Sequence, residues 1–183
     1  MRYDPLYKAI LIPPALTLAV KNFVQSKKSE PAEALDPNGI TRRSASVTWI
    51  KEPALLAPFL DIAKTINRDT AWDFDVDVLE PLQYTEYAPG DEYGWHCDQH
   101  RTPYADGRVR KFSFSVFLND DFEGGAFDLE IHAPNVDVRY LTFERMRPNT
   151  ALFFQADLWH RVRPVSQGVR KSLVGWVLGK KFK

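Results

Sequence analysis

A series of short alternating segments constrains the fold of this chain more than any other feature. From Trp72 onward, apolar and polar side chains alternate with a period of two, and Gly, Pro, Asn and Asp separate the segments. Such segments are typical of an all-β sandwich or barrel, and eight strands favour a jelly roll. The predicted strands are Leu82–Tyr87, Tyr93–Asp98, Lys111–Leu118, Ala126–Ile131, Tyr140–Phe143, Ala151–Gln155, Trp159–Pro164 and Lys171–Leu178.

The residues before Trp72 show helical spacing instead. We expect a strand at Tyr7–Ile12 and a helix that begins at Pro13-Pro14, because proline is tolerated in the first turn. A second strand is predicted at Ser46–Ile50, and a second helix from Pro53 to about Asn67. The apolar faces predicted to pack on a sheet are Leu16, Val20, Phe23 and Val24, then Leu55, Leu56, Phe59, Ile62, Ala63 and Ile66. Between them, Ser26–Gly39 is rich in charge, Pro and Ser/Asn, and we expect a mobile loop there.

The chain shows neither an internal repeat nor a sharp change of composition. Its 183 residues, 44% of them hydrophobic, are enough for one well-cored domain. We therefore expect a single domain over residues 1–183, in which residues 1–71 supply N-terminal strands and supporting helices. Residues 72–183 would form the jelly-roll core.

Charge, cysteine content and hydropathy limit the partners and the compartment. Lys+Arg and Asp+Glu both number 24, so the chain lacks the basic excess of nucleic-acid-binding domains. Cys97 is the only cysteine, which excludes an intramolecular disulfide and favours a reducing, cytoplasmic location. The apolar run Ala9–Val20 contains two prolines and lacks a small-residue cleavage site, so we interpret it as a strand and a helix start rather than a signal peptide. No run approaches the ~18 apolar residues of a membrane span, and no membrane partner is expected.

A histidine and a carboxylate lie two residues apart in the stretch Tyr87–Asp98, YAPGDEYGWHCD. Residues i and i+2 of a strand point to the same face, so His96 and Asp98 could bind one ion together. His160, in a separate predicted strand, is a third candidate ligand. Two histidines and one carboxylate with open coordination positions form the facial triad of non-haem Fe(II) oxygenases. The alternative is that each histidine is structural, which is the commoner role of a single histidine.

The other two histidines lie in different settings. His100 follows the motif in a loop, and His132 lies beside Ala133-Pro134 at a strand end. We expect neither to be a ligand.

A basic residue lies downstream of the third candidate ligand. Arg170 begins the last strand in phase with Ser172, Val174 and Trp176. A buried guanidinium requires an anionic partner. A dicarboxylic acid with a 2-oxoacid end could chelate the metal at that end and form a bidentate pair with the arginine at the other.

The third predicted strand has two faces of different character. Every second residue from Phe112 to Leu118 is apolar, whereas the opposite face carries Ser113, Ser115 and Phe117. A mixed face of small polar residues suits a barrel interior that leaves room for a ligand. The alternative is that the serines face water, where Phe117 would be poorly placed.

These residues resemble the Fe(II)/2-oxoglutarate-dependent dioxygenase superfamily, and within it the prolyl-4-hydroxylase-like branch. The resemblance covers about Trp72–Trp176 and rests on the order and spacing of several motifs. The matching elements are Tyr87, Pro89-Gly90, Tyr93–Asp98, Val116–Asn119, Gly124-Gly125 and His160–Arg170.

The resemblance implies a fold, a metal and a co-substrate. The fold would be mainly β with N-terminal helices, a double-stranded β-helix (jelly roll, cupin-like). His96, Asp98 and His160 would be the catalytic Fe(II) ligands. The other residues expected to bind or border 2-oxoglutarate are Arg170, Tyr87, Ser172, Val162 and Trp176. O2 is the second co-substrate, and L-ascorbate is a further candidate cofactor.

Three positions depart from the branch pattern. Phe117 stands where prolyl hydroxylases often carry a tyrosine that helps to hold 2-oxoglutarate, and Tyr87 or Ser172 is expected to compensate. Ala126 replaces a frequent glutamate. Trp176 stands where nucleic-acid demethylases carry a second arginine, so nucleic acid is not the expected substrate.

The expected function is hydroxylation, with conversion of 2-oxoglutarate and O2 into succinate and CO2. The branch implies a peptidyl proline as substrate, and the alternative substrate is a free amino acid or another small molecule. A cupin-like module that binds a metal without turnover is a third reading, but such a module has no need of Arg170. The segment Gln99–Arg110 follows the metal motif and is either a substrate lid or an ordinary solvated loop.

Overall fold

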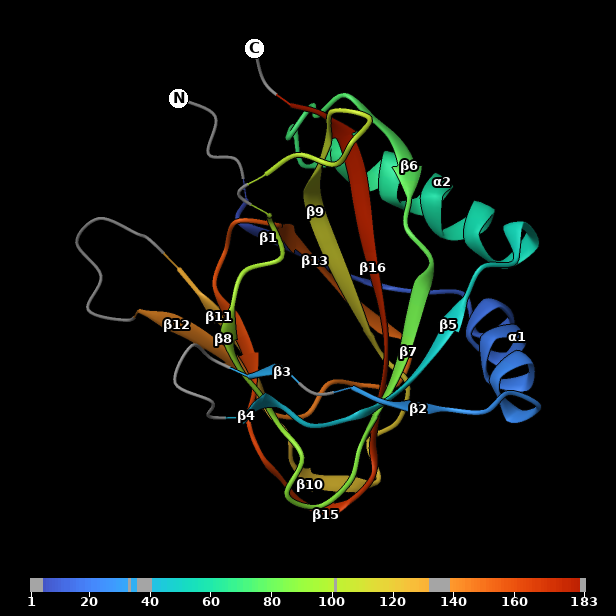
Figure 1. Cartoon of the computed structure of the whole chain (residues 1–183), viewed down its shortest axis with the longest axis vertical. Coiled ribbons are helices and arrows are strands. Elements are labelled where there is room, and N and C mark those ends of the chain that lie inside the picture. The colour runs from blue at the N-terminus through green and yellow to red at the C-terminus, as the bar shows by residue number, and fades with distance from the viewer. Residues whose placement is uncertain (1–4, 33, 36–40, 101, 132–138, 182–183) are drawn as a thin grey trace.

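Two antiparallel sheets face each other in the computed structural model, and two helices lie outside the larger sheet (Figure 1). The structure describes residues 5–32, 34–35, 41–100, 102–131 and 139–181. Within these residues the larger sheet has the strand order β1-β13-β9-β16-β7-β5-β2, with β6 beside β16. Its strands are β1 (Tyr7–Leu11), β2 (Glu30–Pro31), β5 (Ser46–Ile50), β6 (Val76–Leu79), β7 (Leu82–Tyr87), β9 (Arg108–Phe117), β13 (Thr150–Gln155) and β16 (Arg170–Lys180).

The smaller sheet has the order β12-β11-β14-β8-β4-β3, and β10 and β15 form a separate pair. These strands are β3 (Ala34–Leu35), β4 (Thr41–Arg43), β8 (Tyr93–His96), β10 (Phe122–Gly124), β11 (Phe127–Glu130), β12 (Tyr140–Phe143), β14 (His160–Val162) and β15 (Val165–Gly168). The predicted mainly β fold with N-terminal helices is confirmed.

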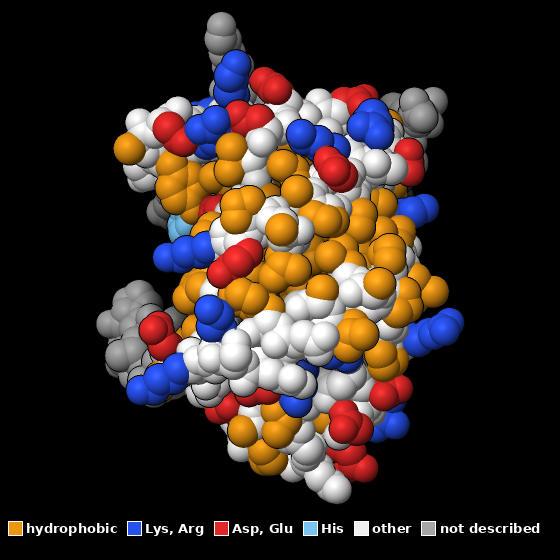
Figure 2. Space-filling view, turned by 90° about the vertical axis from the view of Figure 1, so that its right-hand side faces the viewer, with side chains coloured by type: hydrophobic (Ala, Val, Ile, Leu, Met, Phe, Trp, Pro, Cys, Tyr) orange, Lys and Arg blue, Asp and Glu red, His pale blue; other side chains and the backbone are white. Residues whose placement is uncertain are grey.

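Both predicted helices are present and begin at proline. Helices α1 (Pro14–Gln25) and α2 (Pro53–Asp69) carry the predicted apolar faces and pack them against the larger sheet. The ring of Phe59 in α2 stacks on Phe114 of β9 at 5.7 Å between centroids. Figure 2 shows this side of the molecule, where hydrophobic side chains gather across the middle of the face. No helix in the described ranges is long and apolar enough to cross a membrane.

The alternation of β9 separates two cores. Phe112, Phe114, Val116 and Leu118 belong to the apolar cluster under the helices. Phe117 points the other way, into a second cluster between the two sheets with Phe127 and Phe154. Ser113 and Ser115 are buried on this inner side, and Ser115 lines a cavity. The serines therefore do not face water, which confirms the barrel-interior interpretation.

Some predicted boundaries were wrong, and several strands were not predicted. All eight strands predicted after Trp72 exist, Leu82–Tyr87 and Tyr140–Phe143 with the predicted bounds and the other six with shifted ends, but β4, β6, β10 and β15 had no counterpart in the prediction. These strands have three or four residues, too few for a period-two pattern to show. The expected loop Ser26–Gly39 contains β2 and β3, and its residues 33 and 36–39 lie outside the described ranges.

Candidate metal and co-substrate site

The three candidate metal ligands converge between the sheets. Neighbouring strands β8 and β14 place His96 directly opposite His160. Asp98 follows β8 by two residues, and its backbone N–H donates to the carbonyl of Ala156 at 2.9 Å. One possible ligand atom from each of the three side chains lies within 4.8 Å of the others. Asp98 Oδ1 is 3.9 Å from His96 Nε2, and its Oδ2 is 3.6 Å from His160 Nε2.

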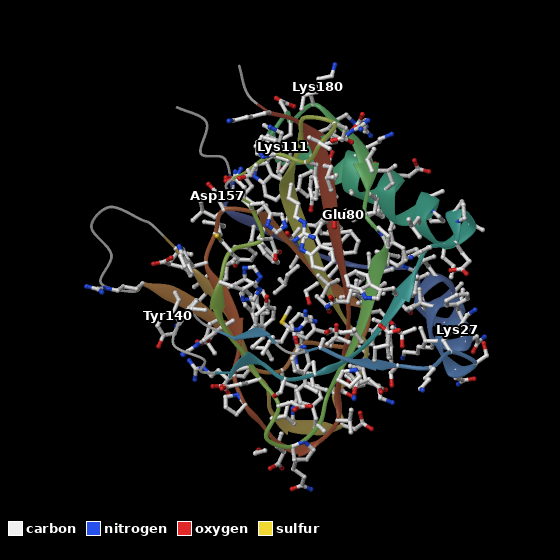
Figure 3. The ribbon with its side chains drawn as sticks, viewed as in Figure 1. Lys27, Glu80, Lys111, Tyr140, Asp157 and Lys180 are labelled. Carbon is white, nitrogen blue, oxygen red and sulfur yellow. The ribbon has the colours of Figure 1, made fainter. Side chains whose placement is uncertain are left out.

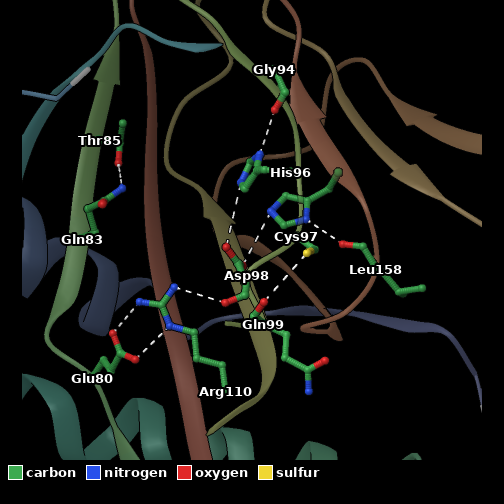
Figure 4. Close-up of polar contacts among 11 residues, drawn as sticks. Glu80, Gln83, Thr85, Gly94, His96, Cys97, Asp98, Gln99, Arg110 and Leu158 are labelled. Carbon is green, nitrogen blue, oxygen red and sulfur yellow. Dashed lines mark hydrogen bonds and ion pairs between the residues drawn. The ribbon is translucent and has the colours of Figure 1, made fainter. Parts of the chain in front are cut away.

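Backbone carbonyls fix the orientation of both imidazole rings (Figure 4). His96 Nδ1 lies 2.8 Å from the carbonyl of Gly94, and His160 Nδ1 lies 3.0 Å from that of Leu158. Because a carbonyl only accepts, each Nδ1 carries the proton and each Nε2 keeps a lone pair directed at Asp98. This tautomer is the one that a metal-binding histidine requires.

Protonation states at the site also fit a divalent metal. Burial, reinforced by the neighbouring His160, lowers the pKa of His96 to about 3. Burial alone raises the pKa of Asp98, but its interactions with His160 and His96 outweigh this and lower the pKa overall. A neutral imidazole and an ionised carboxylate are the forms that coordinate metals. The donor set therefore fits Fe(II).

A buried arginine forms the other end of the site. Arg170, at the start of β16, is 1% exposed, and its Nη1 donates to Ser172 Oγ at 3.2 Å. Its Nε and Nη2 have no hydrogen-bond partner within the described residues. The guanidinium carbon lies 5.4 Å from the ring of Tyr87 and 5.2 Å from that of Phe117. A buried, unpaired guanidinium of this kind fits an anionic ligand.

One cavity of about 200 Å³ joins the two ends. Side chains from both sheets fill the space around it (Figure 3). All of the site residues predicted from the sequence line it: His96, Asp98, His160, Arg170, Tyr87, Ser172, Val162 and Trp176. The structure therefore brings together every residue that the sequence nominated, from strands β7, β8, β14 and β16 and the turn after β8.

Comparison with known proteins identifies the family. Residues 82–178 match the 2OG-Fe(II) oxygenase superfamily. The chain belongs to this superfamily. Its members use Fe(II), 2-oxoglutarate and O2, so this chain is a 2-oxoglutarate-dependent Fe(II) oxygenase.

Curated relatives agree with this assignment. A PKHD-type hydroxylase of Sphingopyxis alaskensis is 34% identical over 158 residues, which is 85% of this oxygenase and 67% of the relative. A PKHD-type hydroxylase of Synechococcus elongatus is 37% identical over 102 residues, 54% of this chain and 43% of the relative. The chain thus spans about two thirds of the first relative and less than half of the second.

Two solved structures show the fold. A Pseudomonas putida prolyl-4-hydroxylase has a TM-score of 0.72 at 20% identity, and the match covers 97% of this chain and 94% of that one. The viral collagen prolyl hydroxylase of Paramecium Bursaria Chlorella virus-1, solved with 2OG, has a TM-score of 0.68 at 18% identity over 96% and 97% of the chains. These likenesses support the jelly-roll fold.

The cavity of this oxygenase is also lined by residues that were not predicted as site residues, two arginines and a tryptophan among them. Arg43 of β4, Trp49 of β5 and Arg110 of β9 all reach it. Arg110 was placed in a loop, whereas it belongs to β9, where a register shift inserts Lys111 as an extra residue opposite β16. A bulge of this kind changes which side chains point inward, and a strict alternation pattern does not reveal it.

Arg110 lines the cavity and forms an ion pair with Glu80 (Figure 4). Its Nε and Nη2 donate to the two carboxylate oxygens of Glu80 at 2.8 and 2.7 Å. The guanidinium lies 4.1 Å from the ring of Trp176, and Nη1 reaches the backbone carbonyl of Asp98 at 3.5 Å.

The segment Gln99–Arg110 is anchored at its far end. Arg108 and Arg110 belong to β9, and Tyr104 donates to Glu80 at 2.8 Å. The lid hypothesis therefore does not apply to the residues from Arg108 onward. His100 contacts Tyr104 rather than the metal-ligand cluster, and His132 lies outside the described residues.

Proposed function

We propose that this oxygenase is a hydroxylase that couples the conversion of 2-oxoglutarate and O2 into succinate and CO2 to oxidation of a substrate C–H bond. One observation carries the proposal: the lone pairs of His96 and His160 converge with Asp98 in the same cavity as the unpaired Arg170. We further propose that residues 1–183 act as one domain, because the helices of residues 1–71 support the sheet that carries Arg170.

His96, Asp98 and His160 would hold the metal. Fe(II) bound there would supply redox chemistry and the open coordination positions that accept a 2-oxoacid and O2. The Gly94 and Leu158 carbonyls keep the two rings in the ligating tautomer. Asp98 stays ionised, so the site needs no deprotonation step before the metal binds.

Arg170 would bind the distal carboxylate of 2-oxoglutarate through its two free donors, Nε and Nη2. Ser172 Oγ accepts a hydrogen bond from the third nitrogen, Nη1, and so fixes the plane of the guanidinium. Phe117 packs its ring against the guanidinium but offers no hydroxyl, and the buried phenol of Tyr87 supplies a polar group on this wall. Val162 and Trp176 shield the cavity from water.

A peptidyl proline is the first substrate we propose. The supporting comparison is structural: a prolyl hydroxylase from Trichoplax adhaerens, TM-score 0.66 at 18% identity over 94% of this chain and 83% of that one, was solved with a hypoxia inducible factor peptide. A free amino acid or another small molecule is the second candidate. The guanidinium of Arg43, a further cation in the cavity, favours a substrate with a free carboxylate.

Succinate formation tests the proposal. Purified protein is incubated with Fe(II) and 2-oxoglutarate, alone and with proline-containing peptides, free amino acids or oligonucleotides. We expect turnover to require both Fe(II) and 2-oxoglutarate and to rise with a peptide or an amino acid, but not with an oligonucleotide. Failure of the metal-loaded protein to bind 2-oxoglutarate would show that it is a metal-binding module without this activity.

A further inference from the structure

A second guanidinium without a partner faces the same cavity. Arg43 ends β4, pairs through its backbone with Tyr93 of β8, and lines the cavity. Its Nε and Nη2 are buried and have no hydrogen-bond partner among the residues that the structure describes. The side chain of Arg43 likewise makes no ion pair with any residue of the described ranges. Two buried donors of a cation are costly to leave unpaired, so the site is built for an anion.

Stacked rings connect Arg43 to the metal-ligand cluster. Its guanidinium carbon lies 4.9 Å from the ring centroid of Tyr93. The ring of Tyr93 in turn stacks on His96, with 3.5 Å between centroids and 13° between planes. This stack fixes the guanidinium beside the proposed metal site while leaving its edge, which carries the donors, unoccupied.

Arg43 differs from the other two cavity arginines. Arg110 is neutralised by both oxygens of Glu80 and has no free charge to offer. Arg170 contacts the rings of Tyr87 and Phe117 and is the proposed partner of the distal carboxylate of 2-oxoglutarate. Arg43 is therefore the cavity arginine that has neither an ion-pair partner in the described ranges nor an assigned ligand.

The net charge of the proposed complex also favours an anionic second substrate. Arg43 and Arg170 contribute two positive charges to the cavity, and Asp98 contributes one negative charge. A divalent ion would add two positive charges, and the 2-oxoglutarate dianion would remove two. One positive charge is then left beside buried side chains, where an unbalanced charge is unfavourable.

We propose that Arg43 binds a carboxylate of the second substrate, so that the molecule hydroxylated by this protein is an acid. Arg43 would hold that carboxylate by its paired donors, beside the stack of Tyr93 on His96. The inference rests on the proposed function and narrows its substrate class. The carboxylate could belong to a free amino acid, to the C-terminal residue of a peptide, or to an acidic side chain beside the oxidised residue.

Matched acid and amide ligands test the inference without turnover. Protein loaded with Zn(II), which cannot change redox state, is saturated with 2-oxoglutarate and titrated in a calorimeter. Three pairs of ligands distinguish the possible origins of the carboxylate. L-proline and L-prolinamide test a free amino acid, and a tripeptide ending in proline, as acid and as amide, tests a peptide C-terminus. An end-blocked peptide with Asp or Asn beside proline tests an acidic side chain. In at least one pair the acid should bind about tenfold or more tightly than its amide partner.

Variants test whether Arg43 causes the preference for an acid over its amide. Arg43→Gln should abolish the difference between acid and amide while leaving Zn(II) and 2-oxoglutarate affinity within about twofold of wild type. Arg68→Gln, which removes the same charge from the exposed surface of α2, should change nothing. Arg43→Lys keeps the charge without the fork and should retain part of the preference.

Three outcomes would overturn the inference. The first is equal affinity within every pair, or no binding by any acid, in the wild-type protein. The second is an acid preference that persists in Arg43→Gln. The third is loss of 2-oxoglutarate binding in Arg43→Gln as large as in Arg170→Gln, because Arg43 would then serve the co-substrate. In the first two cases the protein still binds 2-oxoglutarate, so the proposed function itself would stand.

Discussion

Asp98 is buried, with its carboxylate oxygens 3.9 Å from His96 Nε2 and 3.6 Å from His160 Nε2, so one divalent ion could bind all three groups. Asp98→Ala should therefore reduce Zn(II) affinity and abolish Fe(II)-dependent succinate formation. The metal-free domain should stay folded with an unchanged or higher melting temperature. Calorimetric titration with Zn(II) and thermal unfolding measure both effects.

Asp157→Ala is the matched control for this change. Asp157 is an exposed acid (labelled in Figure 3) that follows Ala156, whose carbonyl accepts from the Asp98 N–H, and its loss should affect neither metal affinity nor turnover. Full succinate formation by Asp98→Ala would refute the ligand assignment, and unfolding of the metal-free variant would show that Asp98 is structural.

Arg170→Ala removes the buried guanidinium at the far end of the cavity. It should weaken 2-oxoglutarate binding by about 2–5 kcal/mol, the usual range for truncating one partner of a buried charge pair. Zn(II) affinity should be nearly unchanged, because Arg170 is not a ligand. Calorimetry of 2-oxoglutarate with the Zn(II)-loaded variant measures the change.

Lys171→Ala serves as the control for Arg170→Ala. Lys171 is the next residue of β16 and points to the opposite face, where it pairs with Glu86 at 3.7 Å. Its loss should leave 2-oxoglutarate affinity intact. Wild-type affinity in Arg170→Ala would mean that the distal carboxylate is bound elsewhere in the cavity.

At the scale of single elements, β16 connects the helix-side core with the cavity. Its cavity side carries Arg170, Ser172 and Trp176, while Gly175 faces Phe114 on the helix side. A Cβ at Gly175 would overlap the ring of Phe114, which stacks on Phe59 of α2. The glycine therefore sets the distance at which α2 packs on the sheet.

Gly175→Ala should destabilise the protein by about 1–3 kcal/mol, the usual cost of overpacking a core. Urea unfolding measures the loss. In a Phe114→Leu background the smaller side chain leaves room for the methyl group, so the same substitution should cost clearly less. Equal costs in both backgrounds would show that the overlap with Phe114 is not the cause.

At the scale of the whole molecule, the smaller sheet depends on a buried carboxylate. Asp128 of β11 accepts hydrogen bonds from Arg161 of β14 at 2.6 Å, from Arg163 at 2.8 Å and from Thr142 of β12 at 2.8 Å. Burial alone would raise the pKa of Asp128, but the hydrogen bonds from Arg163, Arg161 and Thr142 lower it overall.

The lowered pKa of Asp128 predicts how the free energy of unfolding depends on pH. The unfolded chain takes up a proton at Asp128 near pH ~3.9, whereas the folded protein does so only at lower pH. The stabilisation is thus complete above about pH 4 and is lost as pH falls through the folded-state pKa. Asp128→Asn should lower stability at neutral pH and flatten its fall in acid, as measured by urea unfolding between pH 7 and 3.

Asp61→Asn, at an exposed position on α2, is the control for Asp128→Asn and should leave the acid dependence unchanged. An equally steep loss of stability in acid for Asp128→Asn and the wild type would show that other groups dominate the titration.

Local rules in the sequence determined much of this protein. The two-residue spacing of His96 and Asp98 places both side chains on one face, and the alternation in β9 separates phenylalanines from serines. Proline in the first turn marked the start of both helices. These features depend only on backbone geometry within a few residues, so the sequence could reveal them before any contact between strands was known.

The tertiary structure decided what depends on pairing between distant strands. The register that sets His96 opposite His160, and the bulge that turns Arg110 inward, are set by packing between strands that are far apart in sequence. Arg43 lies in a three-residue strand with no periodicity of its own, and only its pairing with Tyr93 brings it to the cavity. Local spacing therefore named the metal ligands, whereas strand pairing determined which other charges share their cavity.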